Sequence, residues 1–350
     1  MLSAREVAFD VLLKTSIKDN AHADDELRRI AAPLESRDAG LAEEIVFGVL
    51  RHQAQLDYII RQLARGVLDI EVRIALRMGI YQLRYLDRIP PHAAVGETVD
   101  LVKRAHKLSA AGLVNAVLRR VNRDPMEWPD RATALSCPEW LLMRWEKQFG
   151  KDVAEGIARA ALERPQEYRR GERIMDIGAQ SIVPLLELKA GERLLDLCAA
   201  PGNKTLQAME TPGVQIVSCD VEWRRLRQVP TEQRVTLDAA EPLPFGRVFD
   251  KILVDAPCSG TGTLGRNPEI KWRLKPADLT RQQQRQKQIL ASAMRVLKPA
   301  GRLVYATCAL EEDENEMVVR PFGPKSTVYR LPGRDPGDGF FAAVFSSALG

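Results

Sequence analysis

Two cysteines stand where a thiol could act as a chemical reagent. Cys258 follows an apolar run at 251–254 and Cys308 follows another at 302–306, so each lies just past an expected strand. Ligands of an open α/β sheet bind beyond the carboxyl ends of its strands. A thiolate is a strong nucleophile without a histidine partner if nearby positive charge lowers its pKa, and Lys204 is a candidate source of that charge. The usual alternative, that a lone cysteine is a small buried hydrophobe, is less attractive for two cysteines at neighbouring strand ends.

A loop of small residues follows the first expected strand and runs from Cys198 to Thr205 as Cys-Ala-Ala-Pro-Gly-Asn-Lys-Thr. Small side chains let the backbone approach a ligand closely. The loop matches neither GxGxxG nor GxxxxGK[ST], so a dinucleotide or a Walker-type phosphate site is not expected. Asp220 ends the next strand, where an acid commonly binds ribose hydroxyls, and Asp238 could read an adenine amino group. Although an isolated aspartate more often caps a loop, the ordered combination predicts a nucleoside ligand such as S-adenosylmethionine.

A methyl donor beside a reactive thiolate indicates methylation of a pyrimidine at C5. C5 of cytosine is a poor nucleophile, but a thiolate that adds at C6 converts the ring into an enamine whose C5 can attack the methyl group. An acid must hydrogen-bond N3 as charge develops there, and Asp255 is predicted to do so. A second group must help to remove the C5 proton or to release the adduct, and Cys258 is placed for that role. The base must be unstacked so that both ring faces are accessible.

The second half of the chain reads as strands alternating with helices, which predicts a parallel sheet covered on both faces. A helix is expected over 280–297, begun by a capping box of Thr280 and Gln283 and ended by the Pro-Ala-Gly sequence at 299–301. The expected strands are 193–197, 215–219, 235–237, 251–254 and 302–306.

The first 125 residues have apolar positions at helical spacing and predict a small helical bundle. The outer face of its last helix carries Arg119, Arg120 and Arg123. Residues 124–137 are rich in Pro, Asp and Trp and read as a linker, followed by helix over 138–162. We therefore expect three parts: a helical domain at 1–125, a linker and connecting segment at 126–190, and a catalytic domain at 191–350.

Charge and composition narrow the class of protein. The net charge is only +4, yet residues 263–302 contain ten basic and two acidic side chains. Such a block is a candidate binding surface for a polyanion, although a solvated helix face is equally compatible with it. The residues singled out for RNA binding are Arg119, Arg120, Arg123, Arg266, Lys271, Arg273, Arg281 and Arg285.

The cysteine and histidine census points to a reducing compartment. Five scattered cysteines without a CxxC pair predict neither a disulfide framework nor a cysteine zinc site, and no metal is expected. No apolar run of 18 residues and no secretory leader is evident, so we expect a cytoplasmic protein without a membrane partner. All histidines precede the candidate site: His22, His52, His92 and His106.

Three segments resemble motifs I, IV and VI of the RNA 5-methylcytosine methyltransferases: DLCAAPGNKT at 196–205, DAPCSGTG at 255–262 and ATC at 306–308. The N-terminal segments VFGVLRHQAQLDYII and AAGLVNAVLRRVNR are similar to the NusB-like RNA-binding domain. The small-subunit rRNA methyltransferase B (RsmB/Sun) family joins these domains in this order. The resemblance covers nearly the whole chain. It implies an α/β Rossmann-like, S-adenosylmethionine-dependent methyltransferase with an N-terminal all-α domain, acting on cytosine C5 of 16S rRNA or its assembly intermediate.

The resemblance also implies residue roles. In the family the cysteine after threonine is the nucleophile, so that role falls on Cys308, and Cys258 aids product release. Asn203 stands where the family usually has glycine, and the stretches after Arg164, Arg227 and Val319 look short, which concerns RNA docking rather than chemistry. Cofactor contacts are implied for Cys198, Ala199, Ala200, Pro201, Gly202, Asn203, Lys204, Asp220, Asp238 and Asp255.

Two other functions share parts of this pattern. A tRNA or DNA cytosine methyltransferase would have the same core, but in DNA-type enzymes the Pro-Cys cysteine is the nucleophile and Cys308 would have no role. A non-catalytic RNA-binding assembly or transcription factor would be a decayed enzyme, which the intact loop and both cysteines argue against. Binding of S-adenosylmethionine distinguishes the second alternative. A monomer is expected.

Overall fold

The computed structural model describes residues 2–18 and 21–346. The chain divides into two compact units, which are treated separately below. Unit 1 comprises Met1–Met143, Ala161–Arg164 and Leu264–Arg273, and unit 2 comprises Arg144–Ala160, Pro165–Thr263 and Leu274–Gly350. The three-part division at 125/126 and 190/191 stays a prediction. Within the described ranges, no helix combines the length and apolar character that crossing a bilayer requires.

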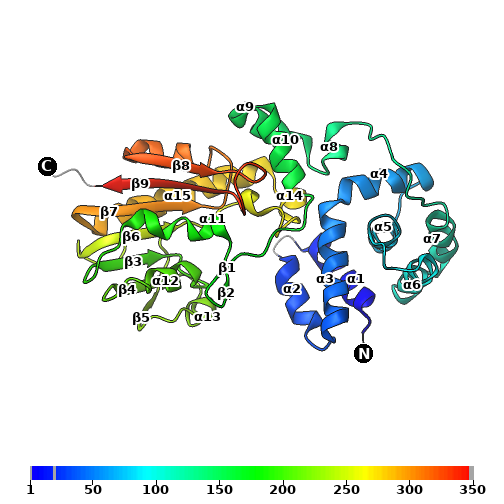
Figure 1. The fold of residues 1–350 in the computed structure, drawn as a ribbon, viewed down its shortest axis with the longest axis horizontal. Helices are drawn as coiled ribbons and strands as arrows, with labels where there is room; N and C mark the ends of the chain where they lie inside the picture. The colour runs from blue at the N-terminus through cyan, green and yellow to red at the C-terminus, as the bar shows by residue number, and fades with distance from the viewer. Residues whose placement is uncertain (1, 19–20, 347–350) are drawn as a thin grey trace. The chain divides into compact units, whose positions relative to one another are not determined.

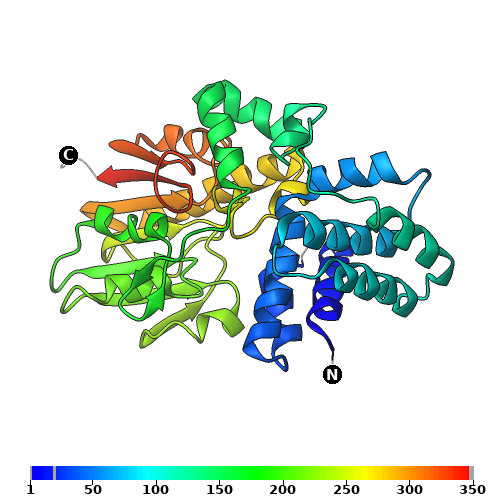
Figure 2. The same ribbon diagram turned by 45° about the vertical axis from the view of Figure 1, so that its right-hand side comes forward.

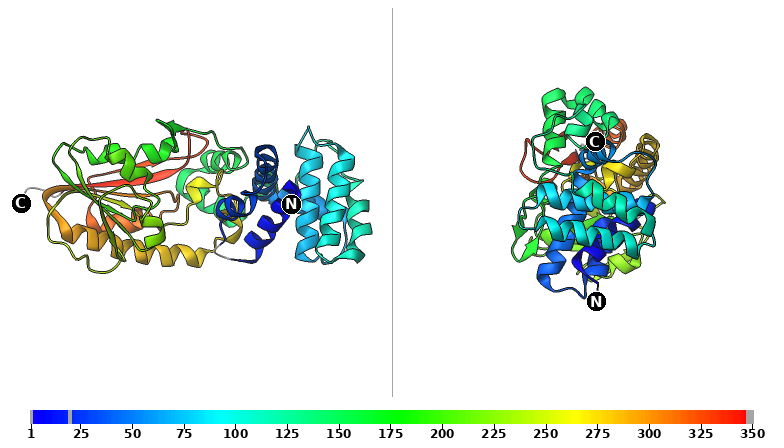
Figure 3. Two further views of the ribbon diagram at one scale, coloured as in Figure 1. Left: turned by 90° about the horizontal axis from the view of Figure 1, so that it is seen from below. Right: turned by 90° about the vertical axis from the view of Figure 1, so that its right-hand side faces the viewer.

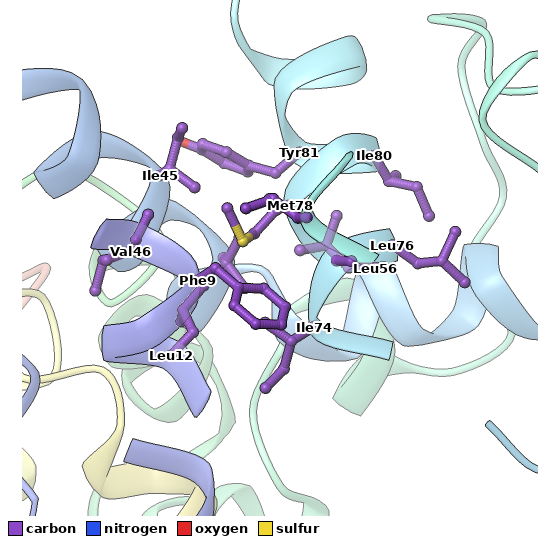
Figure 4. Packing of buried hydrophobic residues seen from close by; sticks show 14 of the residues in the cluster. Phe9, Leu12, Ile45, Val46, Leu56, Ile74, Leu76, Met78, Ile80 and Tyr81 are labelled. Atoms are coloured by element: carbon purple, nitrogen blue, oxygen red, sulfur yellow. The ribbon is translucent and has the colours of Figure 1, made fainter. Parts of the chain in front are cut away.

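Unit 1 is a bundle of α-helices, as the apolar spacing predicts (Figure 2). Its core is formed by the apolar faces of helices α1 to α7, with Phe9, Ile45, Leu56 and Met78 among the contributors (Figure 4). Hydrophobic burial of this kind is the main source of stability of such a bundle. The helices of unit 1 are α1 (Ala4–Ile17), α2 (Ala23–Ala31), α3 (Ser36–Arg51), α4 (Gln53–Leu63), α5 (Ile70–Tyr85), α6 (Pro91–Arg104), η1 (Leu108–Ala110), α7 (Ala111–Leu118), α8 (Arg131–Ala134) and α14 (Ile270–Arg273).

Local sequence explains the helix ends. Ser3 caps α1 by accepting a hydrogen bond from the Glu6 N–H, while the Glu6 carboxylate accepts from the Ser3 N–H. Pro91 is the first residue of α6, where its missing N–H has no cost. The predicted linker contains the short helix α8, whose N-cap is Asp130. The expectation that Arg119 and its neighbours lie on the outer face of the last helix is wrong, because α7 ends at Leu118.

Two of the three candidate arginines that follow α7, Arg120 and Arg123, bond to the bundle itself. Arg120 donates to the carbonyl of Leu63, at 3.4 Å. Arg123 donates to the carbonyls of Leu83 and Leu86 and forms an ion pair with Asp87. These side chains still expose part of their surface, and their role in RNA binding stays a prediction.

Segment 264–273, which the sequence attaches to the catalytic domain, belongs to unit 1. The Lys271 ammonium is buried and donates to the carbonyl of Arg51 at 2.9 Å, and the Trp272 indole N–H donates to the carbonyl of Leu50 at 2.7 Å. Burial lowers the pKa of Lys271 to about 8. The RNA-binding prediction is therefore wrong for Lys271, because its charge serves an internal helix end and cannot reach a phosphate. Arg273 similarly donates to the carbonyl of Ala21.

Two glycines of α3 provide a matched test of this packing. A Cβ at Gly48 would lie 1.9 Å from the Tyr81 ring, whereas nothing lies within 4 Å of a Cβ at Gly40. We expect Gly48→Ala to destabilise unit 1 by about 1–3 kcal/mol, because the buried ring must shift. Gly40→Ala is expected to stabilise it by about 0.5–1 kcal/mol through helix propensity. Thermal unfolding followed by circular dichroism measures both, and equal midpoints for the two variants would contradict the packing.

Unit 2 contains a seven-stranded sheet in the order β5-β4-β3-β6-β7-β9-β8 (Figure 1). The first five strands are parallel and β9 and β8 are antiparallel. The strands are β1 (Arg169–Arg170), β2 (Arg173–Ile174), β3 (Arg193–Leu197), β4 (Gln215–Asp220), β5 (Gln233–Thr236), β6 (Phe249–Asp255), β7 (Leu297–Thr307), β8 (Ser326–Arg330) and β9 (Phe340–Ser346); β1 and β2 form a separate hairpin. The helices are α10 (Lys151–Ala160), α11 (Ile177–Gln180), η2 (Val183–Leu186), α12 (Asn203–Ala208), α13 (Trp223–Leu226), η3 (Thr261–Thr263), α15 (Pro276–Val296), α16 (Glu316–Val319) and η4 (Arg320–Phe322), and α9 (Glu139–Phe149) spans the boundary between the units.

Alternate strand residues face opposite layers of helix, which confirms the predicted α/β fold. Leu195 and Ile252 pack against α15, whose Ile289 and Ala293 belong to the same buried cluster. Leu194 and its face neighbours pack instead against η2 and α12. Figure 3 shows α15 along one side of the sheet and α11 with η2 on the other. Because both faces are covered, the strands read as continuous apolar runs.

Two details differ from the sequence prediction. Strands β8 and β9, which the sequence patterns did not predict, extend the sheet with antiparallel pairing, and β9 carries the apolar run 340–345. Helix α15 begins a turn before Thr280, because Pro276 occupies its first turn and the Asp278 carboxylate accepts from the Lys275 N–H at 2.9 Å. The helix ends at Val296, close to the predicted boundary.

Candidate active site

The carboxyl ends of the central parallel strands meet around one cavity of unit 2. It has a volume of about 320 Å³, within the range of small-molecule sites. Predicted site residues from all four central strands line it. They are Cys198, Ala200, Lys204, Asp220, Asp255, Cys258 and Cys308, together with Arg285 from α15.

The two cysteine sulfurs are neighbours at this cavity. Cys258 Sγ and Cys308 Sγ are 3.4 Å apart, although 50 residues separate them in the chain. The hydrogen bond to Cys308 raises the pKa of Cys258 well above its ordinary value, and burial and the charge of Glu314 act in the same direction. Cys258 therefore keeps its proton and can donate it to the Cys308 sulfur. With the proton assigned to Cys258, Cys308 is the candidate nucleophile of the pair.

An ion pair lies beside the thiols. Lys204 Nζ is 2.6 Å from Asp255 Oδ2, and both side chains line the cavity. Burial by itself lowers the pKa of Lys204, but the charge of Asp255 and its hydrogen bond outweigh that effect, and the net pKa is raised. The Cys308 sulfur also contributes to raising the pKa of Lys204. Lys204 is thus a persistent positive charge next to the candidate nucleophile, as the sequence predicts.

The loop after β3 is folded against the end of β4. Asp220 accepts hydrogen bonds from the N–H groups of Ala200 and Glu222, at 3.2 and 3.0 Å, which fix its carboxylate at the cavity. Cys198 and Gly202 adopt positive φ values of 62° and 107°. At Gly202 a Cβ would also come within 3.3 Å of the Val229 backbone, so glycine is needed there for conformation and space.

Some predicted contacts lie elsewhere. Asp238 is outside the lining of the cavity; its carboxylate accepts from Arg285 at 2.9 Å and from the Ala240 N–H at 3.0 Å. Arg285 is thereby engaged at the cofactor cavity rather than on a separate basic surface. Arg281 is exposed and pairs with Asp278. Ala199, Pro201, Gly202 and Asn203 shape the loop without lining the cavity.

Sequence reasoning missed several apolar wall residues. Ile289 comes from α15 and Phe340 from β9, with Leu237 and Val221 beside the acidic strand end. Ile289 lies within the helix predicted over 280–297, where nothing marks it as a cavity residue, and Phe340 begins a strand that was not predicted. Apolar residues of this kind carry no local motif that distinguishes a cavity wall from core.

Three buried carboxylates surround the catalytic loops. Burial raises the pKa of Asp196 to about 7, although the Thr205 hydroxyl donates to it at 2.5 Å. Burial likewise raises the pKa of Glu314 to about 7, and it raises that of Glu311. Raised values of this kind concentrate at functional sites, although buried structural networks also produce them.

The cavity residues fit S-adenosylmethionine. Asp220 offers a fixed carboxylate suited to a ribose diol, and Leu237 and Ile289 provide an apolar wall for a purine ring. The thiols open on the same cavity, so a methyl group held there would lie on the side of the nucleophile. The described geometry is therefore compatible with a nucleoside-containing methyl donor.

Comparisons with known proteins match both halves of the chain. Residues 183–331 match the family model described as 16S rRNA methyltransferase RsmB/F, and residues 2–123 match the NusB family. Ribosomal RNA small subunit methyltransferase B of Klebsiella pneumoniae is 31% identical over 402 residues, covering 91% of this chain and 93% of that protein. The protein of the same name from Vibrio cholerae is 32% identical over 390 residues, covering 89% and 90%.

Alignments of this length exceed the 350 residues of the chain, so these relatives carry segments without a counterpart here. Among solved structures, PH0851 superposes with a TM-score of 0.78 at 21% identity and covers 97% of each chain. A methyltransferase homolog protein from Pyrococcus horikoshii superposes with a TM-score of 0.50 at 24% identity, covering 63% of this chain and all of that one. These structures share the fold. Taken with the two family matches, the extent of the curated similarity confirms the predicted resemblance: the chain belongs to the RsmB/F family of S-adenosylmethionine-dependent methyltransferases and carries a NusB-family domain before its catalytic domain.

Proposed function

We propose that the protein methylates C5 of a cytosine in small-subunit rRNA through a covalent bond between Cys308 and C6 of the base. The pair of sulfurs 3.4 Å apart at the cofactor cavity carries the proposal. A simple methyl transfer to an oxygen or an exocyclic nitrogen needs no thiol, whereas activation of C5 needs a nucleophile at C6. The names of the matching family and of the relatives, which are rRNA methyltransferases, support an rRNA substrate.

Each side chain has a separate task. The Cys308 thiolate adds to C6, and electrons pass through the ring toward C5 and N3. N3 takes a proton from solvent as the charge develops, and the Asp255 carboxylate, held by its ion pair with Lys204, accepts a hydrogen bond from that N3–H. S-adenosylmethionine supplies the methyl group as an electrophile. Cys258 then assists removal of the C5 proton, and the C6–sulfur bond breaks to regenerate the Cys308 thiolate.

The electrostatics support this division of labour. Lys204 favours a negative sulfur at Cys308, while the raised pKa of Cys258 keeps a proton on the second sulfur. Two equivalent thiols would compete for the same carbon. A proton held on Cys258 leaves Cys308 as the nucleophile and makes Cys258 its acid–base partner.

Loss of the C5 hydrogen provides the direct test. We expect small-subunit rRNA labelled with tritium at cytosine C5 to release one tritium for each methyl group that is transferred. Methylation without tritium release would place the methyl group on another atom and contradict the C5 proposal. Equal or faster reaction with tRNA would instead assign a tRNA substrate.

A further inference from the structure

Cys258 lies between two backbone groups that are fixed by the same pair of buried side chains. The Ser259 N–H donates to Glu314 Oε1 at 2.9 Å, and Gln286 Nε2 donates to the carbonyl of Pro257 at 2.9 Å. Gln286 Nε2 also donates to Glu314 Oε1 at 3.0 Å. We infer that Glu314, with Gln286, is the positioning residue that holds Cys258 against the Cys308 sulfur for the release step. This inference rests on the proposed function.

The carboxylate is anchored to the strand that carries the nucleophile. The Tyr305 hydroxyl donates to the backbone carbonyl of Glu314 at 2.8 Å, and the Thr307 hydroxyl donates to Asn315 Oδ1 at 2.6 Å. Asn315 Nδ2 in turn donates to the carbonyl of Ala309 at 3.0 Å. Glu314 therefore ties the Cys258 backbone to the end of β7, and the separation of the two sulfurs depends on it.

The free-energy cost of burying the Glu314 carboxyl group indicates that this residue has a role other than packing. Glu314 and Gln286 are both 0% exposed. No lysine, arginine or histidine forms an ion pair with Glu314 in the described part of the chain. A buried carboxyl group without a cationic partner is expensive compared with an apolar side chain of the same volume. Here the carboxyl group accepts the N–H next to Cys258, which an apolar side chain cannot do.

Glu311 acts on a different part of the same loop. It accepts from the Thr261 hydroxyl and, at 3.1 Å, from the Trp145 indole N–H. The Ser259 hydroxyl also donates to Glu311, at 3.4 Å, but the backbone groups on either side of Cys258 bond to Glu314 and Gln286. Glu312 is a matched control on the same turn, since its carboxylate makes no hydrogen bond to the described residues of that segment.

The experiment separates release from methyl transfer. The full chain reacts with small-subunit rRNA and tritiated S-adenosylmethionine, and both methyl transfer in the first turnover and covalent protein–RNA adduct on denaturing gels are measured. We expect Glu314→Ala to slow release by about 10- to 100-fold, because a displacement of about 1 Å has effects of that size. Its first-turnover methyl transfer should remain comparable to wild type, so the adduct accumulates.

Conservative and control variants complete the test. Glu314→Gln retains an acceptor oxygen for the Ser259 N–H and should restore most of the release rate, whereas Glu312→Gln should behave as wild type. If Glu314→Ala does not fold, as judged by circular dichroism, Gln286→Ala is expected to accumulate adduct and decides the question. Normal turnover without adduct in the folded variants overturns the inference alone, provided that Cys258→Ala traps adduct. If wild type transfers no methyl group and Cys258→Ala traps nothing, the proposed function fails and the inference falls with it.

Discussion

Cys308→Ala is expected to abolish methyl transfer to rRNA, with a loss of at least about 10³-fold, because it removes the sulfur that activates C5. Cys258 is 3.4 Å away, but its pKa is raised and it retains its proton, so it is a poor substitute nucleophile. The cavity keeps Asp220 and its apolar wall, so affinity for S-adenosylmethionine should change little. Transfer of tritiated methyl groups and equilibrium binding of the cofactor measure the two effects separately.

A second cysteine variant controls for loss of a thiol as such. Cys137 is buried in unit 1 and does not line the cofactor cavity. Cys137→Ala should retain methyl transfer, with at most a small loss of stability from the removed sulfur. Substantial methyl transfer by Cys308→Ala would exclude the covalent mechanism, whereas equal loss in both variants would indicate a general effect on folding.

The sequence predicted the central strands well because parallel strands covered on both faces are continuous apolar runs. Strand β3 spans the predicted 193–197, and β6 contains the predicted 251–254. The loops after these strands carry recognisable chemistry, so Lys204, Asp220 and both cysteines could be assigned to one edge before their distances were known. Topology alone brings these residues together.

Side-chain partners could not be predicted in the same way. A run of basic residues at 263–302 suggested an RNA surface, yet Lys271 is buried against the helix end at Arg51. Arg285 bonds to Asp238 at the cofactor cavity. The sequence does not show what a charged side chain contacts, since the same lysine can bind a phosphate or donate to a buried carbonyl. The role of a charged side chain depends on long-range packing. Lys271 of α14, for example, contacts the end of α3 at Arg51, which lies more than 200 residues earlier in the chain.

The hydrogen bonds of Glu314 and Gln286 around Cys258 could not be predicted from the sequence either. Glu314 lies in an acidic stretch, Glu-Glu-Asp-Glu-Asn-Glu at 311–316, that reads as a solvated turn. Two of its carboxylates, Glu311 and Glu314, are instead buried against the Cys258 loop. Charged residues are rarely buried, so an acidic stretch of sequence predicts exposed side chains. The burial of these two carboxylates becomes evident only in the folded structure.

Cys258→Ala is expected to limit the enzyme to about one turnover. Addition of Cys308 to C6 and methyl transfer to C5 do not need the second thiol, so each protein should transfer close to one methyl group and then remain joined to the RNA. Turnover should fall by about 10²- to 10⁴-fold, the range that a positioned acid–base group contributes. A denaturing gel with labelled RNA measures the adduct, and Cys258→Ala combined with Cys308→Ala should form none.

The state of Cys258 during the reaction explains why alanine has this effect. In the free enzyme the hydrogen bond to Cys308 is the largest cause of the raised pKa of Cys258, and the charge of Cys308 adds to it. When Cys308 is bonded to C6, its sulfur is a neutral thioether, and both contributions are lost. The pKa of Cys258 then falls, although burial and the charge of Glu314 still raise it above its ordinary value. Once the Cys258 thiol has passed its proton to solvent, the thiolate can accept the proton from C5. Formation of the adduct thus favours the proton transfer that leads to its release. Multiple turnovers by Cys258→Ala without trapped RNA would show that a different group removes the C5 proton.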